Sequence, residues 1–189
     1  MSDLRIFLKH HLDIPDSLIP TVVSFYQAGS LSKDDFLLKK GQYGQKLCYI
    51  QEGYLRFFSY ADTKTITHWI FGGGQLVTDL SSFYLREPAK WNIQAITDVK
   101  MLFITYDDYQ KLRQEIQQWD AYEKRLLVKL MSSLENRVYA FLSMSAEERY
   151  QYLFEAHHEI FNELPLNYLA SMLGMTPETL SRIRRKINS

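Results

Sequence analysis

The side chains best suited to chemistry lie near the C-terminus, in residues 176–187. Glu178, Ser181, Arg182 and Arg185 follow the i, i+3, i+4, i+7 spacing that places residues on one helix face. The opposite face is apolar and consists of Leu180, Ile183 and Ile187. Arginine can bind guanine through paired hydrogen bonds, glutamate can accept from cytosine, and serine can contact a base or a phosphate. The pattern predicts a helix that reads DNA.

The residues before this helix predict a second, shorter helix and a tight turn. Ala170 is small where two helices must approach closely, and Gly174 can adopt the positive φ of the turn. Thr176 can cap the next helix, and Pro177 fits its first turn, where an N–H has no partner. The sequence therefore predicts a helix-turn-helix over residues 166–187. The predicted DNA-contacting residues are Thr176, Glu178, Ser181, Arg182, Arg184, Arg185 and Lys186.

Within that set, Arg184 and Lys186 flank the reading face and are expected to meet phosphates. The alternative is an ordinary surface helix with solvated charges. That alternative leaves the turn glycine, the cap and the preceding short helix without an explanation.

Composition indicates an ordinary folded protein. The chain has 189 residues, of which 46% are hydrophobic and 23% charged, enough for one large domain or two small ones. Its 22 basic and 22 acidic residues cancel, so net charge points to no partner. The charges are nevertheless uneven, because residues 182–186 are basic and the stretch before residue 166 is acidic.

The centre of the chain predicts a β-roll. Residues 4–27 suggest two short helices around Pro15 and Pro20, and residues 28–106 change to short β-rich runs separated by glycines. The runs are 36–38, 47–50, 54–58, 65–70 and 99–104. They lack the long helical crossovers of a parallel sheet, so we expect an antiparallel roll and an α+β chain.

A long helix is predicted next, because residues 106–141 contain neither proline nor glycine. Its apolar seam consists of Leu127, Leu130, Leu134, Val138 and Phe141. The helix either packs on its own β domain or forms a two-stranded dimer interface, and its length favours the dimer. The predicted domains are an effector-sensing β-roll over 1–106, a dimerisation helix over 107–143 and a DNA-binding domain over 144–189.

The sequence gives little support for a metal site or an enzyme active site. Cys48 is a lone cysteine, expected as a small hydrophobe in a strand, and no cluster suggests a metal. Gly72–Gly74 lacks the context of a phosphate loop, and the His pairs at 10–11 and 157–158 lack ligand spacing, so no enzyme is predicted. Haem binding through His68 stays open. The chain shows no signal peptide or membrane span, and we expect it to be cytoplasmic.

The chain resembles the Crp/Fnr family of bacterial transcription regulators. The resemblance is strongest in residues 169–174 and in Glu178-Thr179-Leu180-Ser181-Arg182, which is similar to the Fnr-type recognition pattern. It implies a cyclic-nucleotide-binding-type β-roll (a double-stranded β-helix), a long dimerisation helix and a C-terminal helix-turn-helix. By it, Glu178, Ser181 and Arg182 would touch bases, while Pro177 replaces a DNA-contacting arginine of some relatives. The short 156–166 linker predicts a reduced wing, and Gly41 and Gly53 match turn glycines of the roll.

The resemblance also locates an effector pocket in the β-roll. Nucleotide-binding relatives use an arginine there to neutralise the cyclic phosphate, and the matching residue in this chain is Ala89. Lys90 and Arg86 do not occupy that position, and lysine lacks the arginine fork, so cyclic nucleotide is a disfavoured effector. The predicted pocket residues are Thr78, Asp79, Leu80, Ser81, Ala89, Lys90 and Trp91. Asp79 would hold a ribose hydroxyl, and Trp91 either fills the pocket or belongs to the core.

Together these features predict a homodimeric, sequence-specific transcription regulator, gated by a small ligand that the sequence does not identify. Its expected partners are a near-palindromic double-stranded DNA site and a second copy of the chain, with RNA polymerase a further candidate and no membrane. The alternative is a cyclic-nucleotide or other ligand sensor with weak or vestigial DNA binding.

Overall fold

The computed structural model describes residues 2–62 and 64–187. The chain divides into two compact units, which are described separately. The first comprises Met1–Phe58 with Ile70–Lys129, and the second comprises Ser59–Trp69 with Leu130–Ser189.

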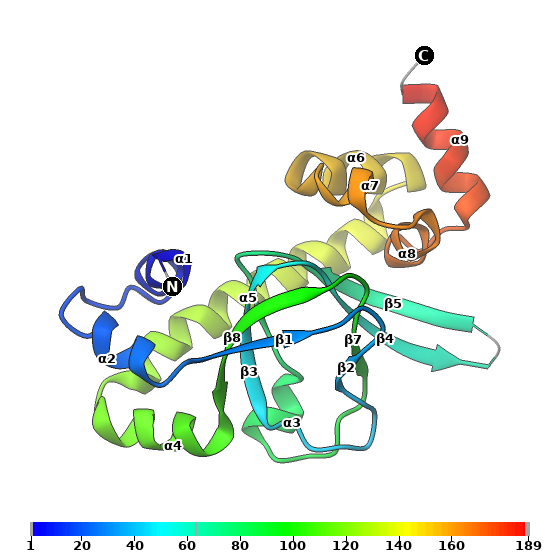
Figure 1. The fold of residues 1–189 in the computed structure, drawn as a ribbon. Coiled ribbons are helices and arrows are strands. Elements are labelled where there is room, and N and C mark those ends of the chain that lie inside the picture. Colours follow the sequence, from blue (N-terminus) through cyan, green and yellow to red (C-terminus); the bar gives the residue numbers. More distant parts are fainter. Residues whose placement is uncertain (1, 63, 188–189) are drawn as a thin grey trace. The chain divides into compact units, whose positions relative to one another are not determined.

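Two antiparallel sheets build the β-roll, with strand orders β1-β8-β3-β6 and β2-β7-β4-β5 (Figure 1). The strands of the described residues are β1 (Gln27–Leu31), β2 (Phe36–Leu38), β3 (Lys46–Glu52), β4 (Leu55–Ala61), β5 (Lys64–Phe71), β6 (Leu76–Val77), β7 (Asn92–Ala95) and β8 (Val99–Thr105). The five predicted runs correspond to β2, β3, β4, β5 and β8. Gly41 and Gly53 adopt positive φ of 87° and 85°, as turn glycines should.

Strand β3 shows how the roll is stabilised. Its successive side chains point to opposite sides, and both sides are buried. Leu47 and Tyr49 join a cluster that includes the surrounding helices, while Cys48 and Ile50 join the core that also includes β2, β7 and β8. Cys48 is fully buried, and burial raises the pKa of its thiol to about 12, so it is the small core hydrophobe that we expected.

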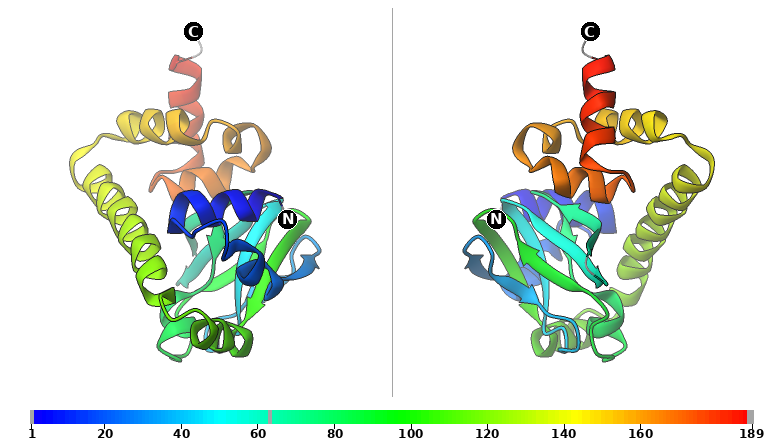
Figure 2. Two further views of the ribbon diagram at one scale, coloured as in Figure 1. Left: turned by 90° about the vertical axis from the view of Figure 1, so that its left-hand side faces the viewer. Right: turned by 90° about the vertical axis from the view of Figure 1, so that its right-hand side faces the viewer.

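Helices of the first unit cover the sheet that contains β3 and β8 (Figures 1 and 2). They are α1 (Ser2–Phe7), the π-helix η1 (Leu8–Leu12), α2 (Ile19–Ser24), α3 (Leu80–Tyr84), α4 (Tyr106–Glu115) and the start of α5 (Trp119–Ser143). Pro20 lies in the first turn of α2, which it can begin without losing a hydrogen bond.

The prediction of one unbroken helix from residue 107 to 143 is wrong. Helix α4 ends at Glu115 and α5 begins at Trp119. At the break Ile116 has extended backbone angles, and Ile116 and Trp119 both bury their side chains in the core, at 5% and 3% exposure.

The second unit is mostly helical. Beyond α5 it contains α6 (Ala146–His157), α7 (Ile160–Glu163), α8 (Leu166–Met172) and α9 (Pro177–Ile187). A capping box begins α6, because Ser145 accepts from the Glu148 N–H and the Glu148 carboxylate accepts from the Ser145 N–H. Instead of the reduced wing expected between residues 156 and 166, the structure has α7 with Phe161 buried, and described residues 106–187 contain no strand. The linker is too short for a hairpin, and burial of Phe161 favours a helical turn.

Candidate functional site

Helix α9 is amphipathic in the predicted sense. The Thr176 hydroxyl accepts from the N–H of Thr179 at 3.2 Å and so caps the helix start. Leu180 is fully buried and Ile183 nearly so, but Ile187, predicted on the same inward face, is 42% exposed because it lies in the last turn of the helix. On the other face Glu178, Arg182 and Arg185 are exposed, and Ser181 and Arg184 are half-buried. Hydrogen bonds from its own N–H and from the Thr176 hydroxyl lower the pKa of the Glu178 carboxyl, which is therefore charged at neutral pH.

The turn before α9 depends on Gly174. Its φ is +67°, and a Cβ placed there would lie 2.8 Å from the ring of Phe141. Ala170 is fully buried, and its carbonyl accepts from the Met175 N–H at 3.0 Å. Both small residues therefore have the roles that the sequence predicted.

Two arginines that the sequence did not assign to the site hold this turn in place. Arg137 donates to the Met172 carbonyl at 3.0 Å, and Arg149 donates to the Leu173 carbonyl at 3.1 Å. These are carbonyls at the end of α8, which lack helical partners. Both guanidinium groups also lie 5.2 Å from the Phe141 ring centre. Burial lowers the pKa of Arg137 to about 10, so it keeps its charge at neutral pH.

The basic residues of α9 differ in their partners. Lys186 Nζ contacts both carboxylate oxygens of Glu147 on α6 at 2.9 Å. Arg182, Arg184 and Arg185 form no ion pair within residues 2–62 and 64–187. Three of the four cations at this end of the helix are therefore available to an external anion.

Helix α5 exposes the predicted apolar seam. The exposed fractions are 37% for Leu127, 39% for Leu130, 54% for Leu134, 50% for Val138 and 42% for Phe141. Exposed leucine and valine at this spacing form a stripe that water solvates poorly. Phe141 differs from the others because its ring also packs against the Gly174 turn.

The predicted effector cassette uses its polar groups internally. One Asp79 oxygen accepts from the Ser82 N–H at 3.1 Å and the Ser81 hydroxyl at 3.0 Å, and the other accepts from the Lys90 N–H at 3.3 Å. Asp79 is thus the buried N-cap of α3 and holds the cassette ends together. Leu80 is exposed and lies away from the cavity described below.

No cation of the cassette is placed to receive a cyclic phosphate. Ala89 is buried, and its N–H and C=O bond to the Gln42 and Gly41 backbone, both at 2.8 Å. Arg86 donates to the Gly44 carbonyl at 2.7 Å and lies 4.1 Å from the Tyr106 ring centre. The ammonium of Lys90 lies 3.7 Å from the Glu87 carboxylate. The residues present do not fit a cyclic nucleotide.

Trp91 belongs to an aromatic cluster of the roll. Its ring centre lies 6.2 Å from that of Phe57, which in turn lies 6.2 Å from Phe71 in an edge-on arrangement. Phe57 and Phe71 pack against the core of the roll. The structure therefore favours the core interpretation of Trp91.

A cavity of 570 Å³ opens in the β-roll at a different place. Its walls come from β1, β2, the loop before β3, β7 and β8, and it contains Thr78 but none of the other predicted pocket residues. The Thr78 hydroxyl donates to the Lys46 carbonyl at 2.9 Å. This cavity is large enough for a small-molecule ligand of the β-roll.

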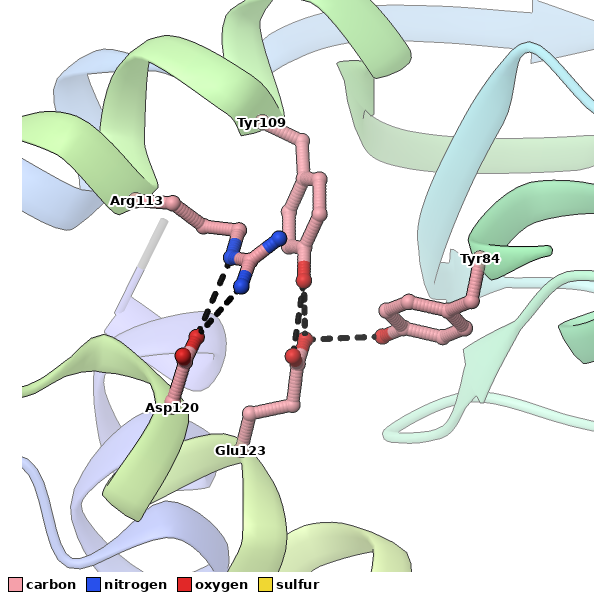
Figure 3. A network of polar contacts seen from close by, with 5 residues as sticks. All are labelled: Tyr84, Tyr109, Arg113, Asp120 and Glu123. Carbon is pink, nitrogen blue, oxygen red and sulfur yellow. Dashed lines mark hydrogen bonds and ion pairs between the residues drawn. The ribbon is translucent and has the colours of Figure 1, made fainter. Parts of the chain in front are cut away.

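The cassette is nevertheless tied to α5 by a partly buried polar network (Figure 3). Glu123 of α5 accepts from the hydroxyl of Tyr84, at the end of α3, at 2.9 Å and from that of Tyr109 at 2.7 Å. Burial and the adjacent Glu123 carboxylate raise the pKa of both tyrosines. Beside them Arg113 donates to Asp120 at 2.9 Å. A shift of α3 would therefore change the position of the first turns of α5.

The described part of the chain contains neither a metal-binding cluster nor a membrane-spanning helix. Residues 2–62 and 64–187 contain no group of three or more His, Cys, Asp or Glu able to hold a metal ion. None of their helices has the length and apolar character needed to cross a bilayer. The ring of His68 contacts the Ser59 hydroxyl at 2.9 Å, and burial and Arg137 lower its pKa.

Comparison with known proteins agrees with this architecture. Residues 29–115 match the cyclic nucleotide-binding domain family. The chain is 19% identical to the Thermus thermophilus catabolite activator protein, over 96% of this chain and 86% of that one, with a TM-score of 0.59. It is 19% identical to CooA from Carboxydothermus hydrogenoformans, over 89% and 78%, and 14% identical to the c-di-GMP responsive global regulator CLP from Xanthomonas campestris, over 92% of both, each with a TM-score of 0.67. None of the curated proteins matches.

These matches confirm the fold that the sequence led us to expect. Residues 29–115 match a cyclic nucleotide-binding domain, and the chain shares the α+β fold of the catabolite activator protein, CooA and CLP structures.

Proposed function

We propose that this chain is a sequence-specific DNA-binding transcription regulator that acts as a homodimer and responds to a small ligand in its β-roll. The observation that carries the proposal is helix α9. It presents Glu178, Ser181, Arg182 and Arg185 on a face opposite its buried leucine and isoleucine. A capped helix with such a face, after a glycine turn, has the chemistry of a major-groove reader.

Within this proposal the residues of α9 have two roles. Arg182 reads a guanine, and Glu178 and Ser181 read neighbouring bases, because they lie at the start of the helix. Arg185 lies on the same reading face, whereas Thr176, Arg184 and Lys186 position the helix on the phosphates. Lys186 must first exchange Glu147 for a phosphate, an exchange between two exposed ion pairs of similar strength.

The homodimer is supported by the seam on α5. The helix has 25 residues, a length of about 37 Å at 1.5 Å per residue. A second copy would cover Leu127, Leu130, Leu134 and Val138, which are all more than one third exposed. Two recognition helices related by a dyad read major grooves about 34 Å apart, so the expected site is near-palindromic.

The ligand that we propose is not a cyclic nucleotide, since Ala89, Arg86 and Lys90 leave the phosphate without a cation. A small ligand of the β-roll cavity would instead contact Thr78, at the start of the cassette. From there the Tyr84–Glu123 hydrogen bond offers a route to α5, whose pairing sets the spacing of the recognition helices.

The proposal is tested by selecting DNA sites from a random duplex pool with purified protein, and by measuring affinity for the selected site against salt. We expect a near-palindromic site and an affinity that falls steeply with salt, since phosphates are neutralised. Leu134→Glu should dissociate the dimer and abolish tight binding, whereas Leu85→Glu, at an exposed loop position, should change neither.

The second candidate is a ligand sensor with vestigial DNA binding, favoured by the β-roll cavity. It predicts a stable dimer that selects no sequence and shows no salt-dependent binding. If the protein sediments as a dimer but enriches no DNA sequence from the random pool, the sensor is favoured. If it enriches a DNA sequence and Leu134→Glu abolishes that enrichment, the regulator is favoured.

A further inference from the structure

A basic groove lies in the first unit between η1 and α5. Its volume is 510 Å³, within the range of small-molecule sites. It is lined by His10, His11, Asp13, Lys124, Arg125, Val128 and Lys129. By comparison, the lining of the β-roll cavity contains one cation, Lys46, among its described residues.

The charge in the groove is unbalanced. Lys124, Arg125 and Lys129 bring three positive charges, and two imidazoles can add more, against the single carboxylate of Asp13. The whole chain, by contrast, carries equal numbers of basic and acidic residues. Asp13 pairs with Arg125, and Lys129 Nζ donates to the His10 carbonyl at 2.9 Å. Arg125 is therefore ion-paired, whereas the ammonium groups of Lys124 and Lys129 can bind an external anion.

The scaffold of the groove is unusual. Residues 8–12 form a π-helix, a rare conformation that is frequently found at functional sites. It ends at Asp13, which adopts the left-handed conformation with φ +60° and directs its carboxylate to Arg125. His11 stacks on the ring of Phe7 at 4.5 Å between centres, which fixes its orientation beside the groove.

We propose that this groove binds a small phosphorylated ligand that carries two or more adjacent phosphoryl groups. Arginine supplies a planar fork for phosphate oxygens, lysines supply mobile point charges, and imidazoles donate hydrogen bonds at close range. The concave shape suits a compact polyanion better than a duplex backbone. This site is separate from the β-roll cavity and from α9, and the proposal does not rest on the proposed function.

Binding would be linked to pH through His11. Burial, Lys129 and His10 lower the pKa of His11, so it is mostly neutral at pH 7. A bound phosphate favours the charged imidazole and raises this pKa, so binding takes up a proton and strengthens as the pH falls below neutral. The other titratable or charged groups that line the groove with His11 are His10, Asp13, Lys124, Arg125 and Lys129.

The test is calorimetric titration of the full-length protein with inorganic pyrophosphate, then with ADP and with orthophosphate, at low ionic strength. We expect saturable binding of pyrophosphate with one site per chain and weaker binding of orthophosphate. Lys129→Gln and Arg125→Gln should each weaken it by about three- to tenfold, as expected for exposed charge pairs. Tighter binding of ADP than of pyrophosphate would identify a nucleotide as the source of the phosphates.

Asp13→Asn gives the sharpest readout, because it removes the only carboxylate of the groove. Asparagine tolerates the left-handed conformation, so the fold should persist. We expect pyrophosphate to bind about three- to tenfold more tightly to this variant. A structural role of Asp13 alone would give no such gain.

Two control variants separate this groove from other basic surfaces. Lys33→Gln removes an exposed lysine elsewhere, and Arg182→Ala removes a cation of α9; neither should change pyrophosphate affinity. Binding that follows Arg182 but not Lys129, or no saturable heat up to about 10 mM pyrophosphate, would overturn the proposal. Either result leaves the DNA-binding proposal intact, since that proposal depends on α9.

Discussion

The cassette of the β-roll and the recognition helix carry similar numbers of polar groups but use them in opposite ways. In the cassette Asp79, Arg86 and Lys90 bond to neighbouring backbone or side chains. On α9, Arg182, Arg184 and Arg185 form no ion pair with any described residue. The polar groups of the cassette therefore stabilise the fold of the first unit, whereas the arginines of α9 are accessible to an external ligand.

The difference follows from what each backbone needs. The cassette is an irregular loop around the five-residue helix α3, so side chains must satisfy its exposed N–H and C=O groups. Helix α9 satisfies its own backbone and is anchored by Leu180 and Ile183. Its polar face is therefore free for recognition, provided that the preceding turn is fixed from outside by Arg137 and Arg149.

The largest expected effect comes from breaking that turn. Gly174→Ala should destabilise the second unit by roughly 2–4 kcal/mol, because alanine must adopt positive φ and its Cβ would press on Phe141. Urea unfolding of the variant measures the loss. Gly41→Ala is the matched control, since Gly41 also has positive φ but no atom lies within 4 Å of the added Cβ. Equal losses in the two variants would mean that the Phe141 contact contributes nothing.

Removing a reading residue should have the next largest effect. Arg182→Ala should cost on the order of 1–3 kcal/mol of affinity for the selected site and relax preference at one position per half-site. Competition binding against duplexes altered at single positions measures both quantities. Arg5→Ala, an exposed arginine of the first unit, should leave them unchanged. A uniform loss across all duplexes would reassign Arg182 to the phosphates.

The cassette side of the comparison is tested at Asp79. Asp79→Ala should lower the free energy of unfolding by about 1–2 kcal/mol even without a ligand, because it removes the cap of α3. Asp79→Asn keeps one accepting oxygen and should lose less. Cyclic AMP should raise the melting temperature of neither the variant nor the unaltered protein. A clear rise in the unaltered protein would show that the cassette does hold a nucleotide.

Local chemistry made the recognition unit predictable from sequence. The cap at Thr176, the turn at Gly174 and the apolar stripe of α9 act over a few residues, and all are present in the structure. The roles of Arg137 and Arg149 were missed because their partners lie 35 and 24 residues away, beyond any periodic signal. The DNA contacts themselves stay predictions.

The features that the sequence did not predict depend on contacts between residues that are distant in the chain. Nothing in the composition of residues 106–141 signals a break, yet α4 ends at Glu115 and α5 begins at Trp119, with Ile116 and Trp119 buried at the break. Strands β1, β6 and β7 were not among the predicted runs, because each is short and its pairing is fixed by strands distant in sequence. The cassette alignment assigned Asp79 to a ribose hydroxyl and could not reveal that its carboxylate caps α3.

The smallest expected effect concerns Lys186, the one cation of α9 that has an internal partner. Its pair with Glu147 is well exposed, so Lys186→Gln should change the free energy of unfolding by less than about 1 kcal/mol. On DNA the variant should bind every sequence slightly less tightly and reduce the salt slope by about 1. Glu147→Gln should leave that slope intact, because it frees Lys186 rather than removing it. A loss of sequence preference in Lys186→Gln would contradict the division of α9 into reading and positioning residues, since a phosphate contact carries no sequence information.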